Sequence, residues 1–352
     1  MIILKIYEGG SIDMKEDYIK SSIMGFVVGD ALGVPVEFSS KKQMQEHPLT
    51  DMEEYGTHNQ PIGTWSDDSS MTLATIDSIN EKGKIDYNDI MKKYSEWKRT
   101  AKYTATDKLF DIGITTSNAI GRYNRGEMNP TECGDYGINN NGNGSLMRSL
   151  PIAIYLANSN LSENEKTKIV NEYSSMTHAH EISRLGCKIY CDFIEGLIKN
   201  NFDKVKALDT IKNKNYKKFY SNETINLYRR VLDGTICNER EENIKGSGYV
   251  LHTLEASVWA IMATDNYSDA VLKSINLGED TDTVGAITGS LAGMIYGYSN
   301  IPNKWLNNIK KRDEVEKISD TFSNMIEKNN LNELNAMFEE PKKKWSFFKH
   351  FK

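Results

Sequence analysis

The 352-residue sequence has few cysteines and few prolines. Four cysteines without a CxxC pair do not suggest a disulfide scaffold in a chain of this length, and they argue against structural zinc. These cysteines are Cys133, Cys187, Cys191 and Cys237. We therefore expect a reducing compartment, taken as the cytoplasm. With only 7 prolines, helices are expected to dominate, and the connections carry Gly and Asn.

The sequence also lacks an excess of positive charge and a long apolar run. A formal net charge of -6 argues against unassisted nucleic-acid binding, which depends on neutralising phosphates. The opening MIILKIYEGG is too short, and too interrupted by Lys5 and Glu8, for a signal peptide. The longest uncharged run, 283–303, is rich in Gly, Ser, Thr and Asn, so we expect a buried helix and a loop rather than a membrane span.

Few segments alternate as strands do, and most repeat apolar residues at the three- and four-residue spacing of helices. Examples are the sets Ile19, Ile23, Phe26, Val27; Leu73, Ile76, Ile79; and Val284, Ile287, Leu291, Met294. The stretch GDYGINNNGNGSLMRSLP reads as a long loop leading into a helix, and residues 200–243 as solvated helices and connections. The pattern predicts a protein in which helices dominate, in one large domain or two.

Glycine repeats every four residues in two of the predicted helices. The sets are Gly25, Gly29, Gly33 and Gly285, Gly289, Gly293, Gly297. Glycine costs a helix about 1 kcal/mol relative to alanine, so a repeat on one face is typical of a close backbone approach. We therefore predict that these two helices pack deep in the core, against each other.

Two segments, GTWSDDSSMT and LGEDTDTVG, combine paired carboxylates with hydroxyls just before a helical pattern. The groups are Ser66, Asp67 and Asp68 in the first segment, and Asp280, Asp282 and Thr283 in the second. Helix capping alone would need one acid in each segment. If the segments meet in space, their oxygens would suit one or two hard cations such as Mg²⁺, and two cations about 3.5–4 Å apart can share an oxygen substrate.

Six motifs in order resemble the ADP-ribosylglycohydrolase family, the relatives of dinitrogenase reductase-activating glycohydrolase. They are GFVVGDALGVPVEF, GTWSDDSSMT, NGNGSLMRSLP, THAHEISR, GSGYVLHTLEASVWA and NLGEDTDTVGAITGSLAG. The resemblance implies an all-α fold, a compact single-domain orthogonal helical bundle. It implies two Mg²⁺ in a central cleft, with Mn²⁺ as the alternative, and carries their ligands onto the six residues of the two acidic segments.

The expected organisation is an N-terminal extension (1–14), the family domain (15–335) and a basic aromatic tail (336–352). The tail is either a loose segment or a binder of a surface or an acidic partner. We expect a monomer without a membrane segment.

The resemblance also implies a substrate-binding set, comprising Gly142, Asn143, Gly144, Ser145, His178 and Tyr249. NGNGSLMR resembles the family's phosphate-binding loop, where small residues let N–H groups approach a diphosphate and the following helix adds its positive end. His178 is implied near the ligand and Tyr249 against the adenosine. Each role has an alternative. The loop could be a plain Gly-rich connection, His178 could cap a helix or pack in the core, and Tyr249 could be a core residue. Arg148 would contact phosphate or order the loop as an ion-pair partner.

Two further acids fall in family blocks. Glu37 lies where the family has an acid close to the metals, and a carboxylate there could act as general base on a bound water. Asp111 lies in a block where relatives carry a catalytic acid near the ribose. Asp30 is interpreted as a supporting or structural residue.

The implied function is hydrolysis of the glycosidic bond at C1 of ADP-ribose attached to a protein side chain, with arginine favoured, which reverses ADP-ribosylation. A nearby carboxylate would stabilise positive charge developing on the ribose. One alternative is a non-catalytic protein that binds ADP-ribose or inhibits a toxin. Another is a hydrolase of a different ADP-ribose compound, such as a serine linkage or an acetyl ester.

Overall fold

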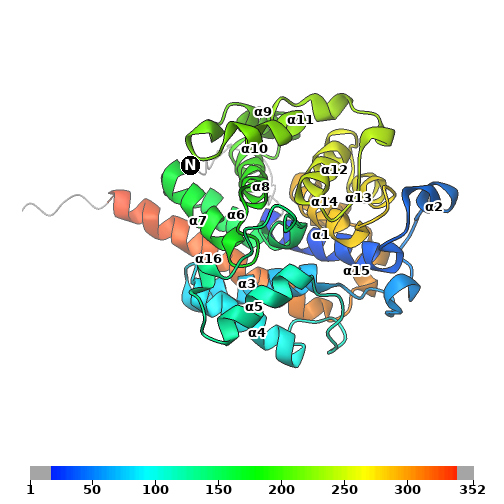
Figure 1. Cartoon of the computed structure of the whole chain (residues 1–352), viewed down its shortest axis with the longest axis horizontal. Coiled ribbons are helices and arrows are strands. Elements are labelled where there is room, and N and C mark those ends of the chain that lie inside the picture. Colours follow the sequence, from blue (N-terminus) through cyan, green and yellow to red (C-terminus); the bar gives the residue numbers. More distant parts are fainter. Residues whose placement is uncertain (1–16, 339–352) are drawn as a thin grey trace, which may run out of the picture.

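The computed structural model describes residues 17–338, with side chains through 329, and within this range it contains α- and 3₁₀-helices and no β-strand (Figure 1). This confirms the predicted all-α class. The α-helices are α1 (Tyr18–Gly33), α2 (Lys41–Glu46), α3 (Asp67–Lys82), α4 (Tyr87–Thr100), α5 (Ile114–Asn124), α6 (Leu150–Ala157), α7 (Glu163–Ser175), α8 (Glu181–Lys199), α9 (Lys204–Lys212), α10 (Asn222–Leu227), α11 (Arg229–Leu232), α12 (Val250–Met262), α13 (Tyr267–Ile275), α14 (Thr281–Tyr296), α15 (Asn303–Asn308) and α16 (Arg312–Phe338). The predicted N-terminal extension and the predicted tail beyond residue 338 lie outside the described residues.

The centre of the fold is the antiparallel pair α1 and α14, as the glycine repeats predict. A Cβ atom built on Gly29 would stand 2.1 Å from the carbonyl oxygen of Gly285, and one on Gly25 would stand 2.3 Å from that of Gly289. No side chain fits in such a gap, so only glycine lets the two backbones approach this closely. Gly297 departs from the set, because it caps the end of α14 with a positive φ of 89°.

This antiparallel pairing brings the end of α1 beside the start of α14. The Thr281 hydroxyl donates to the carbonyl oxygen of Gly33 at 2.8 Å. Segments separated by almost 250 residues in the chain therefore meet at one end of the helix pair. Helix α1 and the turn after it, Tyr18–Val36, are long and apolar enough to match a membrane span, yet 89% of the most apolar window is buried, as in the core helix of a folded domain.

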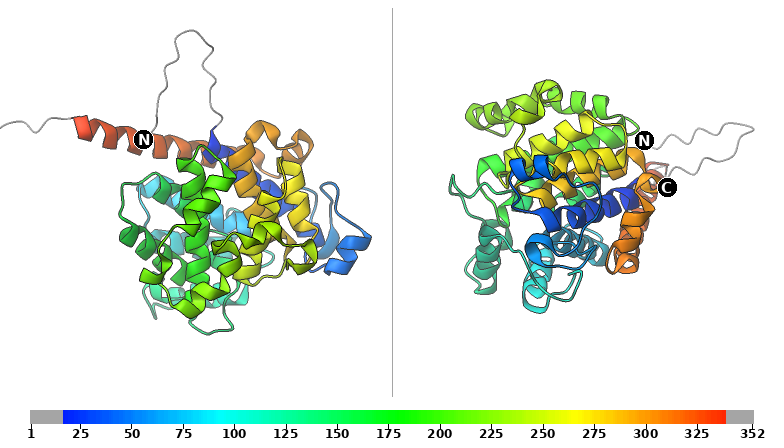
Figure 2. Two further views of the ribbon diagram at one scale, coloured as in Figure 1. Left: turned by 90° about the horizontal axis from the view of Figure 1, so that it is seen from above. Right: turned by 90° about the vertical axis from the view of Figure 1, so that its right-hand side faces the viewer.

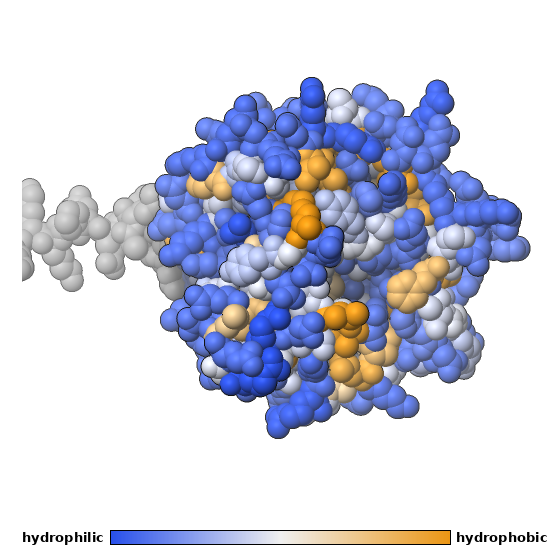
Figure 3. All heavy atoms as spheres, viewed as in Figure 1, coloured by the Kyte–Doolittle hydropathy of each residue, from blue (hydrophilic) through white to orange (hydrophobic). Residues whose placement is uncertain are grey.

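The other helices pack around this pair. Helices α12 and α13 cover α14. Helices α3, α4 and α5 lie together on the other side of the molecule from α12 and α13 (Figure 1). Helix α16 runs along one edge, against α1 and α3, and its end projects beyond the body (Figure 2). The face seen in Figure 3 is largely hydrophilic, with a few separate hydrophobic patches.

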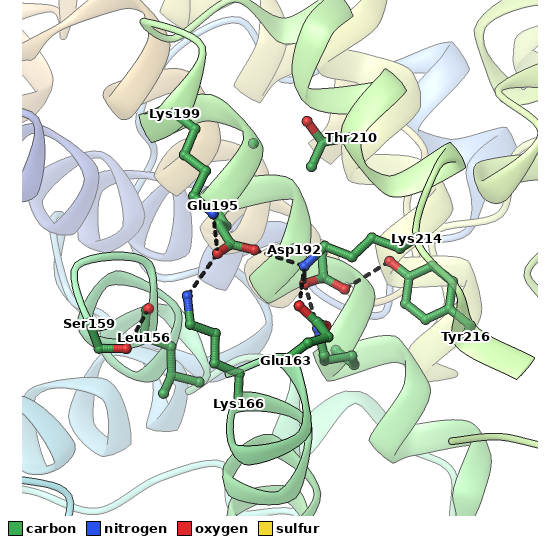
Figure 4. A network of polar contacts seen from close by, with 12 residues as sticks. Leu156, Ser159, Glu163, Lys166, Asp192, Glu195, Lys199, Thr210, Lys214 and Tyr216 are labelled. Atoms are coloured by element: carbon green, nitrogen blue, oxygen red, sulfur yellow. Dashed lines mark hydrogen bonds and ion pairs between the residues drawn. The ribbon is translucent and has the colours of Figure 1, made fainter. Parts of the chain in front are cut away.

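The Lys- and Asn-rich stretch predicted as solvated helices forms α9, α10, α11 and their connections. It is fastened to α7 and α8 by an ion-pair network (Figure 4). Glu195 on α8 accepts hydrogen bonds from Lys166 at 2.8 Å, Lys199 at 2.7 Å and Lys214 at 2.8 Å. Lys214 also reaches Asp192 at 2.8 Å. These carboxylates are already neutralised by lysines, so the network is structural.

Candidate active site

The first acidic segment forms the N-terminus of α3. Ser66 is the N-cap, and its hydroxyl accepts from the Asp68 N–H at 3.2 Å. Asp30, buried on α1, fixes this helix end, because its carboxylate accepts from the N–H groups of Ser66 at 2.9 Å and Ser69 at 3.0 Å. The carboxylates of Asp67 and Asp68 therefore project from a helix end anchored to the central helix pair.

The second acidic segment forms the N-terminus of α14 and meets the first. The Thr283 hydroxyl lies 3.4 Å from Asp68 Oδ2 and donates toward it, and Ser66 Oγ donates to the same oxygen at 3.0 Å. Carboxylate oxygens of Asp280, Asp282 and Glu37 lie within 4.8 Å of one another. The two acidic segments thus share one centre, as the interpretation of paired cation ligands requires.

The electrostatics of this centre favour a bound cation. Burial raises the pKa of Asp67, Asp68 and Asp282 well above the usual range, and neighbouring carboxylates add to the effect. Two buried oxygens, Asp68 Oδ1 and Asp282 Oδ2, have no hydrogen-bond partner within residues 17–338. Unpartnered buried carboxylate oxygens are costly, and hard divalent cations take such ligands. The donor set therefore fits Mg²⁺ or Mn²⁺.

Glu37 lies at the border of this centre, just after α1 and the following 3₁₀ turn. Burial raises its pKa to about 7, opposed by a hydrogen bond with His58 and reinforced by Asp111. A titratable atom of Asp111 lies within 4.8 Å of those of Glu37 and His58. Asp111 has a positive φ of 47°, a conformation that non-glycine residues seldom adopt outside constrained sites. The structure therefore brings both predicted catalytic acids together.

The predicted phosphate loop borders the same centre. The Asn143 side chain donates to Asp280 Oδ2 at 2.9 Å, and its backbone N–H donates to the Gly248 carbonyl at 2.9 Å. Gly142 and Tyr249 pair through an isolated β-bridge. The Ser145 hydroxyl is buried and accepts from Ser174 Oγ at 3.0 Å, so its side chain is bonded within the protein.

The structure confirms that this loop leads into a helix and corrects one expectation, the ion pair of Arg148. Residues 143–145 form a 3₁₀ turn, and helix α6 begins at Leu150, at the end of the predicted loop. Arg148 is fully buried and orders the loop, but through carbonyl groups rather than an ion pair. Its guanidinium donates to the carbonyl oxygens of Gly144 and Tyr173.

The two histidines of THAHEISR differ in role. His180 is the N-cap of α8 and accepts from the Ile182 N–H, whereas His178 lies under the loop. A Cβ atom on Gly144 would meet His178 Cε1 at 2.8 Å, so the ring and the loop backbone are in close contact. Burial lowers the pKa of His178 to about 3, and the charge of Arg148 adds to this effect. The His178 imidazole is therefore neutral at pH 7.

Tyr249 and one residue outside the predicted set complete the surroundings. Tyr249, at the N-cap of α12, is half-buried and packs edge-on against His252 with 5.1 Å between ring centroids. His58, whose Nε2 contacts Glu37 Oε2, was not predicted from the sequence. The only available signal was its place in THNQP, a few residues before the acidic segment, and that spacing does not by itself predict a contact with Glu37.

Fold and site together define a class: an all-α protein with a buried carboxylate centre of the type that divalent cations occupy. The chain belongs to the ADP-ribosylglycohydrolase family, whose sequence profile matches residues 12–332. This confirms the resemblance carried by the six motifs.

Individual relatives agree with this assignment. The chain is 31% identical over 308 residues to the ADP-ribosylarginine hydrolase Tri1 of Serratia proteamaculans, covering 86% of this chain and 78% of that protein. It is 27% identical over 311 residues to the ADP-ribosyl-[dinitrogen reductase] glycohydrolase of Rhodospirillum rubrum, covering 85% and 92%. A solved structure described as an ADP-ribosylglycohydrolase-related protein complex superposes with a TM-score of 0.70 at 27% identity, covering 88% of this chain and 98% of that one.

Proposed function

We propose that this protein hydrolyses the glycosidic bond at C1 of ADP-ribose attached to an arginine side chain, and so reverses ADP-ribosylation. The observation that carries the proposal is the convergence of two acidic segments from opposite ends of the chain in one buried centre, linked by the Thr283–Asp68 contact. A carboxylate able to exchange a proton near neutral pH, that of Glu37, stands at the border of this centre.

The proposed cofactor is a pair of Mg²⁺ ions, with Mn²⁺ as the alternative. Such ions would polarise the oxygens they bind and orient the ribose hydroxyls. The residues that would hold them are Ser66, Asp67, Asp68, Asp280, Asp282 and Thr283. The unpartnered buried oxygens of Asp68 and Asp282 support this assignment.

Residues of the chain supply the proton handling. In the net reaction the hydroxyl of a water goes to C1, the C1–N bond breaks, and the proton of the water ends on the departing guanidine nitrogen. Glu37, with a pKa of about 7, is suited to take that proton and return it. The carboxylate of Asp111, beside Glu37, would stabilise positive charge that develops on the ribose.

The charge of the site favours arginine as the leaving group. Glu37 and Asp111 stand together at the border of the centre, and carboxylates bind a guanidinium through charge-assisted hydrogen bonds. A relative 31% identical to this chain is named an ADP-ribosylarginine hydrolase. A neutral leaving group such as serine gains nothing from these charges.

The test is release of ADP-ribose from arginine-, serine- and nucleic-acid-linked substrates, each with and without Mg²⁺. We expect magnesium-dependent release from the arginine linkage. Asp280→Ala should reduce it by about 100-fold or more, as expected when a group that stabilises the transition state is removed. Asp265→Ala, which alters a carboxylate whose side chain is 98% exposed, is the matched control and should keep full activity.

Three outcomes would overturn all or part of the proposal. Full activity in Asp280→Ala would remove the acidic centre from the reaction. Binding of ADP-ribosylated protein without release by the wild type would identify a non-catalytic ADP-ribose-binding protein. Faster release from serine than from arginine would refute the charge argument for the linkage.

A further inference from the structure

His58 lies in contact with Glu37, the carboxylate to which the proposed function gives the proton. Its Nε2 atom points at Glu37 Oε2, and both side chains are largely buried, at 14% and 6% exposed. We infer that His58 is a positioning residue that holds the Glu37 carboxylate in one orientation through this hydrogen bond. The inference rests on the proposed function.

The turn that carries His58 is built at a conformational cost. Within 55–59, Tyr55, Gly56 and Asn59 all have positive φ, at 66°, 47° and 51°. Side-chain-bearing residues adopt such angles at a cost, and they persist where the surrounding structure demands them. At Gly56 a side chain is excluded, because a Cβ atom there would stand 1.9 Å from the carbonyl oxygen of Pro35. The backbone of the turn therefore packs directly against the backbone at Pro35, two residues before Glu37.

Further hydrogen bonds fasten the turn in that place. The Thr57 hydroxyl donates to the Glu37 carbonyl oxygen at 2.6 Å, and the Gln60 side chain donates to the His58 carbonyl oxygen at 3.1 Å. Tyr55 and Gln60 close the turn through their backbones, at 2.6 and 3.3 Å. The backbones of His58 and Glu37 are thus fixed relative to each other, and the hydrogen bond from His58 then sets the orientation of the Glu37 carboxylate.

The His58 ring is held in turn by two phenyl rings. Its centroid lies 5.8 Å from that of Phe38 and 5.3 Å from that of Phe110, both at tilted angles. These contacts limit rotation of the imidazole, so that Nε2 stays directed at Glu37. Asp111 follows Phe110 directly, so the same packing ties together the two carboxylates of the proposed mechanism.

An imidazole suits a base that gains and loses a proton in each cycle. When Glu37 is ionised, His58 Nε2–H donates to Oε2; when Glu37 is protonated, its O–H can donate to an unprotonated Nε2. The orientation is therefore kept in both states. A side chain that only donates, or only packs, would hold the carboxylate in one state or in neither.

Two variants separate the hydrogen bond from the packing. His58→Phe keeps a ring between Phe38 and Phe110 but removes the nitrogen. His58→Gln loses the ring but keeps an amide, whose N–H can donate to ionised Glu37 and whose oxygen can accept from protonated Glu37. We expect His58→Phe to lower kcat for ADP-ribosylarginine about 10- to 100-fold, with KM and ADP-ribose affinity changed less than about threefold. His58→Gln should recover most of the lost rate.

Crystal structures of the two variants give a readout that does not depend on activity. We expect one ordered Glu37 rotamer in the wild type and His58→Gln, and several in His58→Phe. An ordered, unmoved Glu37 in His58→Phe would overturn the inference, as would wild-type kcat in that variant or equal losses in both. Failure of the proposed function would be seen separately. The wild type would then release no ADP-ribose, while Glu37 would still be ordered in the wild type and disordered in His58→Phe.

Discussion

The packing of α1 on α14 predicts that replacing Gly29 by alanine destabilises the protein, although helix propensity alone favours alanine. Alanine is favoured over glycine inside a helix by about 1 kcal/mol, so Gly29→Ala should stabilise α1 if nothing touches it. In the structure the new Cβ would stand 2.1 Å from the Gly285 carbonyl oxygen and 2.6 Å from its carbon, where ordinary contact begins near 3.4 Å. Because both obstacles are backbone atoms, α1 and α14 must move apart.

Separating two packed helices costs about 1–3 kcal/mol, typical of overpacked cores, so Gly29→Ala should lower the free energy of unfolding. The matched control is Gly121→Ala in α5. There, among the residues that the structure describes, the new Cβ would meet the end of the Arg125 side chain at 3.2 Å, which can swing away. The control should be neutral or stabilised by up to about 1 kcal/mol.

Urea unfolding of both variants beside the wild type measures this difference, with the midpoint reporting stability and the slope checking that the transition stays two-state. The movement would also displace Asp282 from Asp68, so Gly29→Ala should weaken Mg²⁺ binding while Gly121→Ala leaves it unchanged. If Gly29→Ala unfolds at the same urea concentration as Gly121→Ala, the close packing of α1 on α14 is refuted.

Two further predictions concern pH. Burial lowers the pKa of His178 in the folded protein to about 3, whereas the unfolded value is about 6.5. Between these two pH values the unfolded chain binds a proton that the folded protein does not. The free energy of unfolding should therefore decrease as the pH is lowered, by up to about 1.4 kcal/mol per pH unit. Urea unfolding at pH 7, 6 and 5 should show this slope reduced in His178→Gln, and an unchanged slope would contradict the neutral, buried assignment. Burial opposes the charge of Glu195, but hydrogen bonds from Lys166, Lys199 and Lys214 outweigh it and hold its pKa well below the usual range. The charged Glu195 carboxylate stabilises the fold above the unfolded pKa of about 4.3, and this stabilisation is lost as the pH falls below that value. Glu195→Gln should therefore lower the free energy of unfolding by about 3 kcal/mol at pH 7 and by far less at pH 3. An equal loss at both pH values would show that the ion pairs contribute nothing.

The features that could be predicted from the sequence were those written in local repeats or motifs. The four-residue glycine spacing predicted the α1–α14 packing because a close backbone approach needs small residues at each turn of both helices. The acidic segments were recognisable because paired carboxylates with hydroxyls exceed what a helix cap needs. Their meeting depends on the antiparallel direction of α1 and α14 and on Asp30 of α1, which holds the start of α3. The glycine spacing alone fixes neither.

The features that were missed depend on tertiary contacts or on turn geometry. His58 reaches Glu37 through a turn with three positive φ angles, two of them at non-glycine residues, which sequence patterns rarely announce.

The most direct test of the shared acidic centre is a calorimetric titration of chelator-treated protein with Mn²⁺. The account predicts two ions bound per chain in the wild type. Asp68→Asn and Asp282→Asn, altered at opposite ends of the chain, should each weaken binding by about 10- to 100-fold or more, while Asp265→Asn leaves it unchanged. Absence of binding in the wild type, or loss in only one of the two site variants, would contradict a centre built jointly by both segments.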